Sequence, residues 1–159
     1  MKKNIALLIA FGTMTLCTFG QNNAPVSVNA PKDKPIDIVS SEQTKQIDKQ
    51  IAPYVEKAKK TLPGAKTRFK KGLGQGEAFF LTTRIFDKNG KYEQVFIRVK
   101  SREGENITGT IANPLNVVKE YKSGQVITMQ EKNILDWLIT KPDGTEEGNF
   151  VGNYLDSVH

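Results

Sequence analysis

The sequence predicts an α+β fold, with an N-terminal helical region packed on a twisted antiparallel sheet of about five or six strands. Two observations predict this class. Apolar residues recur at helical i, i+3, i+4 spacing between residues 41 and 62, whereas after residue 77 they alternate with polar residues in short runs separated by turn residues. The length of 159 residues and the hydrophobic content of 38% fit one globular domain.

Residues 1–20 have the features of a secretory signal peptide. A pair of lysines precedes a short apolar run, and Thr18 to Gly20 form a small-x-small cleavage signal. The apolar run is shorter than the ~20 residues that cross a bilayer. We therefore expect an exported protein, periplasmic or secreted. Lipidation of Cys17 is an alternative, which Leu16 disfavours because a lipoprotein signal normally has a small residue before its cysteine.

Cleavage after Gly20 would leave a mature chain without cysteine, so neither a disulfide nor a thiol nucleophile is expected. It would also remove two lysines, and the net charge would fall from +6 to +4. This small excess of positive charge suits an anionic envelope polymer or an acidic partner, but the charges are too spread out along the sequence to indicate nucleic-acid binding. Residues 21–40 are rich in proline and polar residues and are predicted to be a flexible leader. The domain is then expected over 41–159.

The helical region is predicted over residues 41–62, where Ser40 and Gln43 form a capping-box signature. Pro53 predicts a kink or two short helices, because its ring removes an amide donor and clashes with the preceding turn. Pro63 and Gly64 are expected to end the helix. Residues 68–76 follow as a mobile connector. Their three alternating glycines lack the ending and the context of a phosphate-binding loop, so no nucleotide site is predicted.

The second half of the chain is predicted to form strands. Asn89 and Gly90 favour a type I′ turn, three successive strands make a meander, and Asn113 with Pro114 forms a rigid corner. The strands are expected over 78–86, 92–100, 107–112, 125–130 and 134–140, with turns at 103–105, 131–133 and 142–144 and a loop or helical turn over 115–122. Residues 150–155 could be either a strand or a helix.

Residues about 55 to 156 resemble the YegJ-like family, the bacterial domain of unknown function 2314. The matching positions are Ala58, Thr61, Leu62, Phe69, Glu93, Phe96, Gly109, Ile111, Asn113, Pro114, Gly124, Asp136, Trp137 and Gly148. The chain departs from the family pattern at Gln94, where members resemble one another in having histidine, and at Phe96, where they have tryptophan. The resemblance implies a compact α+β domain and no particular activity.

Asp136 and Trp137 are the most specific pair in the sequence. Adjacent strand residues point to opposite faces, so a buried Trp137 leaves Asp136 facing solvent or a groove. We expect Trp137 to fill the core and Asp136 to accept a bond from a neighbouring backbone amide. Together with the Asn113 and Pro114 corner, these two residues are the candidate binding residues.

Catalytic candidates are few. Glu93 and Asp136 could supply the carboxylate pair of a glycosidase if they lay about 5–10 Å apart. The one histidine, His159, is the last residue, so a histidine-based relay or zinc site is not expected. Asp143, Glu146 and Glu147 lack calcium-loop spacing. No metal or other cofactor is predicted.

The leading hypothesis is a non-enzymatic binding module for an envelope protein or an anionic cell-wall polymer, without a membrane-spanning segment in the mature chain. The alternative is a hydrolase of envelope glycans that uses Glu93 and Asp136. An enzyme needs a concave site where both carboxylates converge, whereas a binding module needs an exposed apolar or basic patch.

Overall fold

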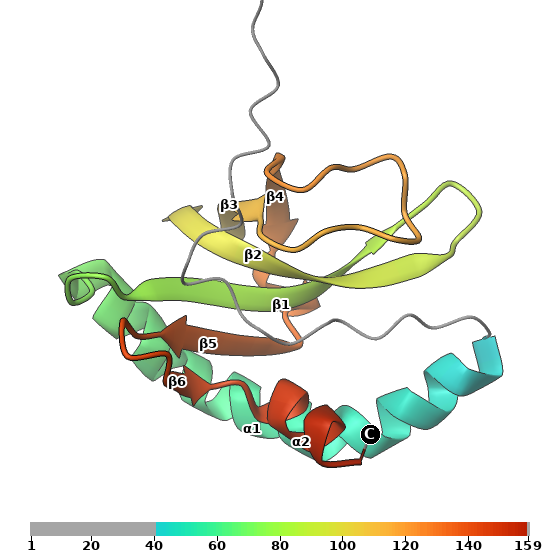
Figure 1. Cartoon of the computed structure of the whole chain (residues 1–159), viewed down its shortest axis with the longest axis horizontal. Helices are drawn as coiled ribbons and strands as arrows, with labels where there is room; N and C mark the ends of the chain where they lie inside the picture. Colours follow the sequence, from blue (N-terminus) through green and yellow to red (C-terminus); the bar gives the residue numbers. More distant parts are fainter. Residues whose placement is uncertain (1–40, 159) are drawn as a thin grey trace, which may run out of the picture.

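A computed structural model describes residues 41–158, which form two helices and one six-stranded antiparallel sheet (Figure 1). The predicted α+β class is confirmed. The strands lie in the order β4-β3-β2-β1-β5-β6. The elements are α1 (Ser41–Lys71), β1 (Ala78–Phe86), β2 (Tyr92–Glu103), β3 (Asn106–Ile111), β4 (Val126–Gln130), the short 3₁₀ helix η1 (Glu131–Asn133), β5 (Asp136–Thr140), β6 (Glu146–Gly148) and α2 (Phe150–Val158). The predicted signal peptide, Cys17, the leader and His159 lie outside the described residues.

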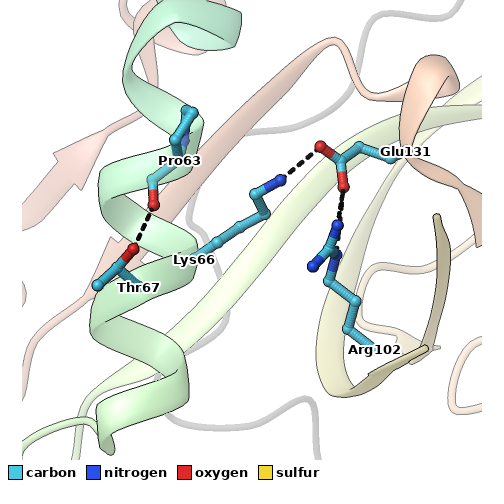
Figure 2. Close-up of polar contacts among 5 residues, drawn as sticks. All are labelled: Pro63, Lys66, Thr67, Arg102 and Glu131. Carbon is cyan, nitrogen blue, oxygen red and sulfur yellow. Dashed lines mark hydrogen bonds and ion pairs between the residues drawn. The ribbon is translucent and has the colours of Figure 1, made fainter. Parts of the chain in front are cut away.

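Helix α1 is continuous over 31 residues, so two separate helices around Pro53 and an end at Pro63 are both wrong, whereas a kink at Pro53 stays a prediction. An internal proline costs a helix roughly 3 kcal/mol. Tertiary contacts beyond Pro63 offset this cost, because Ala65 is buried in the core and Phe69 packs against it. The Thr67 hydroxyl also donates a hydrogen bond of 2.9 Å to the Pro63 carbonyl (Figure 2).

The main core lies between α1 and one face of the sheet. Alternating residues of β1, β2 and β5 supply it, as expected from the period of two, and Val95, Ile97 and Val99 share this face. Trp137 is 5% exposed and its indole N–H reaches the Ala58 carbonyl at 3.2 Å and the Thr61 hydroxyl at 2.9 Å. The predicted core position of Trp137 is confirmed.

Helix α2 packs against the N-terminal half of α1 (Figure 1). Ile51, Val151 and Leu155 are buried between the two helices, and Tyr54 stacks on Tyr154 with ring centroids 4.4 Å apart. The sequence was compatible with either a strand or a helix over residues 150–155, and the structure shows a helix there.

Three local expectations need correction. The hairpin after β1 is not type I′, because Gly90 has a positive φ of 79° but Asn89 does not. Instead, the Asp87 carboxylate accepts bonds from the Asn89 and Lys91 amides and holds a longer loop. The connector over 68–76 is shorter than predicted, since α1 continues to Lys71. Strand β6 was missed, because its sequence Glu-Glu-Gly has no apolar alternation.

Candidate functional site

A cavity of about 320 Å³ opens between the C-terminal part of α1 and strands β1 to β3. Its size is at the lower end of the range for small-ligand sites. We call it the basic pocket because three cationic side chains and five apolar side chains line it. The cations are Lys66, Lys70 and Arg102, and the apolar residues are Phe69, Phe79, Leu81, Val99 and Ile107.

Helix α1 supplies one wall of the basic pocket. Lys66, Phe69 and Lys70 are three and four residues apart, so they lie on one face of the helix. Lysines in the last turns of a helix also interact favourably with the negative end of its dipole. The sequence thus extends α1 beyond Pro63 and brings two of the pocket's cations to its rim.

A β-bulge brings the third cation to the same side of the sheet. Val99 faces the core, and strict alternation would turn Arg102, three residues later, to the opposite face. The register between β2 and β3 shifts between Val99 and Ser101, so that Arg102 pairs with the buried Ile107 and shares its face. One additional residue in β2 therefore determines that a guanidinium lines the pocket.

Glu131 joins two walls of the pocket through ion pairs (Figure 2). Its carboxylate accepts a bond of 2.5 Å from the Lys66 ammonium and bonds of 2.9 and 3.2 Å from the Arg102 guanidinium. Burial on its own raises the pKa of Glu131, but the hydrogen bonds from Lys66 and then from Arg102, with their charges, outweigh burial and hold this pKa below its ordinary value. Glu131 is therefore a fixed anion that aligns two cations.

Lys70 differs from the other two cations of the pocket. Lys70 is exposed, as Arg102 is, but among residues 41–158 it forms no ion pair. An ammonium at the mouth of an apolar hollow can pair with an incoming anion without first breaking an internal ion pair. The arrangement therefore suits a ligand that places an acidic group beside an apolar one.

The candidate catalytic residue Glu93 has a structural role. Its side chain is 2% exposed, and its two carboxylate oxygens accept backbone hydrogen bonds of 2.8, 3.0 and 3.1 Å from Asn116, Val117 and Val118. These bonds satisfy three backbone N–H groups of the loop, which would otherwise need other acceptors. Glu93 therefore anchors the loop between β3 and β4 to β2.

Asp136 is likewise held by backbone amides. It is fully buried and accepts bonds of 2.8 Å from the Trp137 amide and 2.6 Å from the Val151 amide, in the first turn of α2. The predicted bond to a neighbouring amide is confirmed, whereas the expectation that Asp136 faces solvent or a groove is wrong, because the start of α2 packs over it. A carboxylate at this end of a helix satisfies a free N–H group and interacts favourably with the dipole.

The sheet register places these two carboxylates on opposite faces. Glu93 pairs with Ile85 and Asp136 pairs with Thr82. Directly paired strand residues share a face, whereas residues 82 and 85, separated by three positions, point to opposite faces. The structure does not bring Glu93 and Asp136 together.

The predicted corner is also part of the scaffold. Asn113 is buried, its side-chain oxygen accepts a bond of 2.8 Å from the Phe96 amide, and its amide group donates to the Pro114 carbonyl at 2.9 Å. Neither this corner nor Asp136 and Trp137 line the basic pocket. The pocket's cations were not predicted as site residues, because α1 was expected to end before Lys66 and the bulge has no sequence signature.

Within the described part of the chain, no group of three or more potential metal-ligating side chains occurs. Over those same residues, neither helix combines the length and apolar character needed to cross a bilayer.

The architecture defines a small α+β domain with a cationic hollow, and a family model matches this domain. The model is described as an uncharacterized protein conserved in bacteria (DUF2314) and spans residues 48–157, from the second turn of α1 to the end of α2. The chain belongs to this family, and the predicted membership of domain of unknown function 2314 is confirmed. A search of curated proteins and a search of solved structures each found no match.

Proposed function

We propose that the protein is a non-enzymatic binding module, exported from the bacterial cell, whose basic pocket takes an acidic segment of an envelope protein. The observation that carries the proposal is the convergence of three cations over an apolar floor. Buried apolar contacts supply affinity at such a site, and the cations select and orient the acidic group.

The charge around the pocket supports an acidic partner. Residues 57–71 of α1 contain seven lysines and arginines and no acidic residue. Lys60 and Lys71 extend the positive surface beyond the pocket, and both are exposed. A surface of one sign raises the encounter rate with a partner of opposite charge.

The apolar floor favours a protein segment over an anionic polymer. Phe69, Phe79 and Leu81 can bury an aromatic or aliphatic side chain next to the acidic group. A uniformly hydrophilic polyanion would contact only the cationic rim and would gain no affinity from the apolar floor. Polymer binding is therefore the competing outcome of the test.

The hydrolase alternative has no observation in its favour. Glu93 and Asp136 lie on opposite faces, and both carboxylates are occupied by backbone amides. A glycosidase needs two carboxyl groups that flank one bond.

The test uses two labelled peptides of equal length and charge, one alternating glutamate with phenylalanine and one alternating glutamate with serine, together with inorganic polyphosphate. Binding to the wild type is compared with binding to Lys70→Glu and to Lys91→Glu. Lys70 is at the pocket, whereas Lys91 is an exposed lysine before β2, roughly 35 Å along the strand from Arg102. Both variants change the net charge equally.

We expect the phenylalanine peptide to bind at least ~10-fold more tightly than the serine peptide, and Lys70→Glu alone to weaken it by ~10-fold or more. Equal weakening by both variants would mean that only net charge matters and would overturn the pocket assignment. Polyphosphate binding as tight as that of the phenylalanine peptide would favour the polymer. Absence of any binding would also overturn the proposal.

A further inference from the structure

A second cavity of about 320 Å³ lies between the edges of two strands. Residues 83–86 of β1 and residues 127–130 of β4 line it. Consecutive side chains of a strand point to opposite faces of the sheet, so four consecutive residues line one cavity together along the edge of their strand. We call this cavity the edge cleft. It is distinct from the basic pocket, because the two cavities share no lining residue.

Strand β4 bounds one side of the edge cleft. It is one of the two edge strands of the sheet and pairs with β3 alone (Figure 1). The Glu131 amide donates a hydrogen bond of 2.9 Å to the Glu105 carbonyl, in register with this ladder, and so points toward β3. Alternate residues of an antiparallel ladder direct their backbone groups to opposite sides. The backbone groups of Val126, Thr128 and Gln130 therefore point away from β3, toward the cleft.

The second half of β1 bounds the opposite side of the cleft. Strand β1 pairs with β5 only over residues 78–82, whereas its pairing with β2 continues to Phe86. The Leu135 amide donates to the Thr82 carbonyl at 2.9 Å, so the backbone groups of Arg84 and Phe86, two and four residues later, point to this same side. Within the described part of the chain, these groups and the outward groups of β4 have no hydrogen-bond partner.

The two edges of the sheet differ in how they are protected. Edge strands are usually short or charged, because their free backbone groups would otherwise pair with other chains. Strand β6 has three residues, which include Glu146 and Glu147. Strand β4, with the sequence Val-Ile-Thr-Met-Gln, has five residues and neither a charge nor a proline, and its Val126 is 50% exposed. The β4 edge is therefore open to the addition of a strand.

The side chains at the edge cleft favour an uncharged guest. On the α1 side of the sheet lie Ile85, Ile127 and Met129, which would contact alternate side chains of an extended segment. Arg84 is the one charged residue among the described residues that line the cleft, and it already pairs with Asp48. A charged side chain of the guest would lose water there without gaining a free counter-ion.

We propose that the edge cleft binds an extended, uncharged segment of a partner protein, which adds a strand between β4 and the second half of β1. Main-chain hydrogen bonds supply affinity in this mode of recognition, and contacts of alternate side chains supply selectivity. A second copy of the chain would bring a whole sheet into a cleft that strands bound on two sides, and its net charge of +6 opposes self-association. The proposal does not depend on the proposed function of the basic pocket.

The test uses the full chain and the labelled peptide Ser-Val-Thr-Val-Thr-Val-Ser with blocked ends. Alternation gives this peptide one apolar side. It has no charge, so it cannot pair with the cations of the basic pocket. The control peptide has the same sequence with N-methyl groups on its three valines, which removes N–H donors and blocks strand pairing.

The matched protein variants are Thr128→Pro and Thr128→Val. Both lose the hydroxyl that lies 3.0 Å from the Thr108 hydroxyl. Only the proline removes the N–H that points into the cleft, and its ring is compatible with the ladder to β3 because edge strands accept proline on their free side. Fluorescence of Trp137 reports whether the core stays folded, and Lys70→Glu tests whether the peptide uses the basic pocket instead.

We expect N-methylation of the peptide and Thr128→Pro each to weaken binding by at least ~10-fold, with Thr128→Val and Lys70→Glu within ~2-fold of the wild type. Equal affinity of the two peptides for the wild type would overturn the proposal, and this comparison decides even where Thr128→Pro does not fold. Absence of binding, or weakening by Lys70→Glu, would also overturn it. A dimer of the chain that Thr128→Pro dissociates would overturn the partner assignment, because the guest would then be a second copy.

Discussion

Replacing Glu93 by glutamine is the sharpest test of how the fold uses its buried charge. The glutamine keeps one acceptor oxygen, but its NH₂ group is a donor. It would face a backbone N–H group whose hydrogen bond the carboxylate accepts in the wild type. Hydrogen bonds to a charged group contribute about 1.5–3 kcal/mol each, and a buried donor left unpaired costs about 1–3 kcal/mol. Three amides between 2.8 and 3.1 Å depend on this side chain. A neutral glutamine costs less to bury than a carboxylate, which offsets part of this loss. We therefore expect the free energy of unfolding to fall by about 2–4 kcal/mol.

Urea denaturation measures this loss. With a slope of about 2 kcal/mol per molar urea, in the middle of the usual range, the midpoint should fall by about 1–2 M. Glu103→Gln is the matched control, because Glu103 is exposed at the end of β2 and should change stability by less than about 0.5 kcal/mol. A Glu93→Gln midpoint within error of the control would refute the anchoring role. Wild-type stability combined with lost glycan cleavage would instead revive the hydrolase hypothesis.

Two further predictions concern the core and the pocket. Trp137→Ala should reduce the free energy of unfolding by about 3–5 kcal/mol because it empties a buried site between α1 and β5, and a melting temperature near that of the wild type would contradict the core assignment. The pKa of Glu131 is lower in the folded protein than in the unfolded chain, so its ion pairs with Lys66 and Arg102 stabilise the fold at any pH above its pKa in the unfolded chain. This stabilisation is lost as the pH falls through the pKa of Glu131 in the folded protein. The stability difference between wild type and Glu131→Gln, measured by urea denaturation, should therefore be present at pH 7 and shrink towards pH 3; a difference that does not change with pH would exclude the ion pairs as its cause.

The parts of the fold that depend on local periodicity could be predicted from the sequence. Alternation over residues 92–100 predicted most of β2, and the period of two places Val95 and Ile97 on the same face, toward the core. The Asn113 side-chain amide donates to the carbonyl of the next residue, Pro114, and this local bond is the part of the corner that an Asn-Pro pair indicates. Its second bond, from the Phe96 amide 17 residues earlier in the chain, depends on the fold.

The parts of the fold that depend on contacts between distant residues could not be predicted from the sequence. Pro63 is a helix terminator by local preference, and only the packing of Ala65 and Phe69 on the sheet overrides it. The side of the sheet on which Arg102 lies depends on a bulge whose residues look like ordinary strand residues. The basic pocket needs both features at once, which is why its cations were missed.

The distribution of charge across the domain separates catalysis from binding. Glu93 and Asp136 are buried, and both already accept backbone hydrogen bonds, so protonating or moving either one would disrupt a loop or a helix terminus. A general acid or base must instead exchange a proton with a substrate and remain accessible to it. Lys70, in contrast, is exposed at an apolar hollow and forms no ion pair among the described residues. The charges that this domain leaves accessible at a concave surface are positive and suited to recognising an anion, which favours binding as the activity to test first.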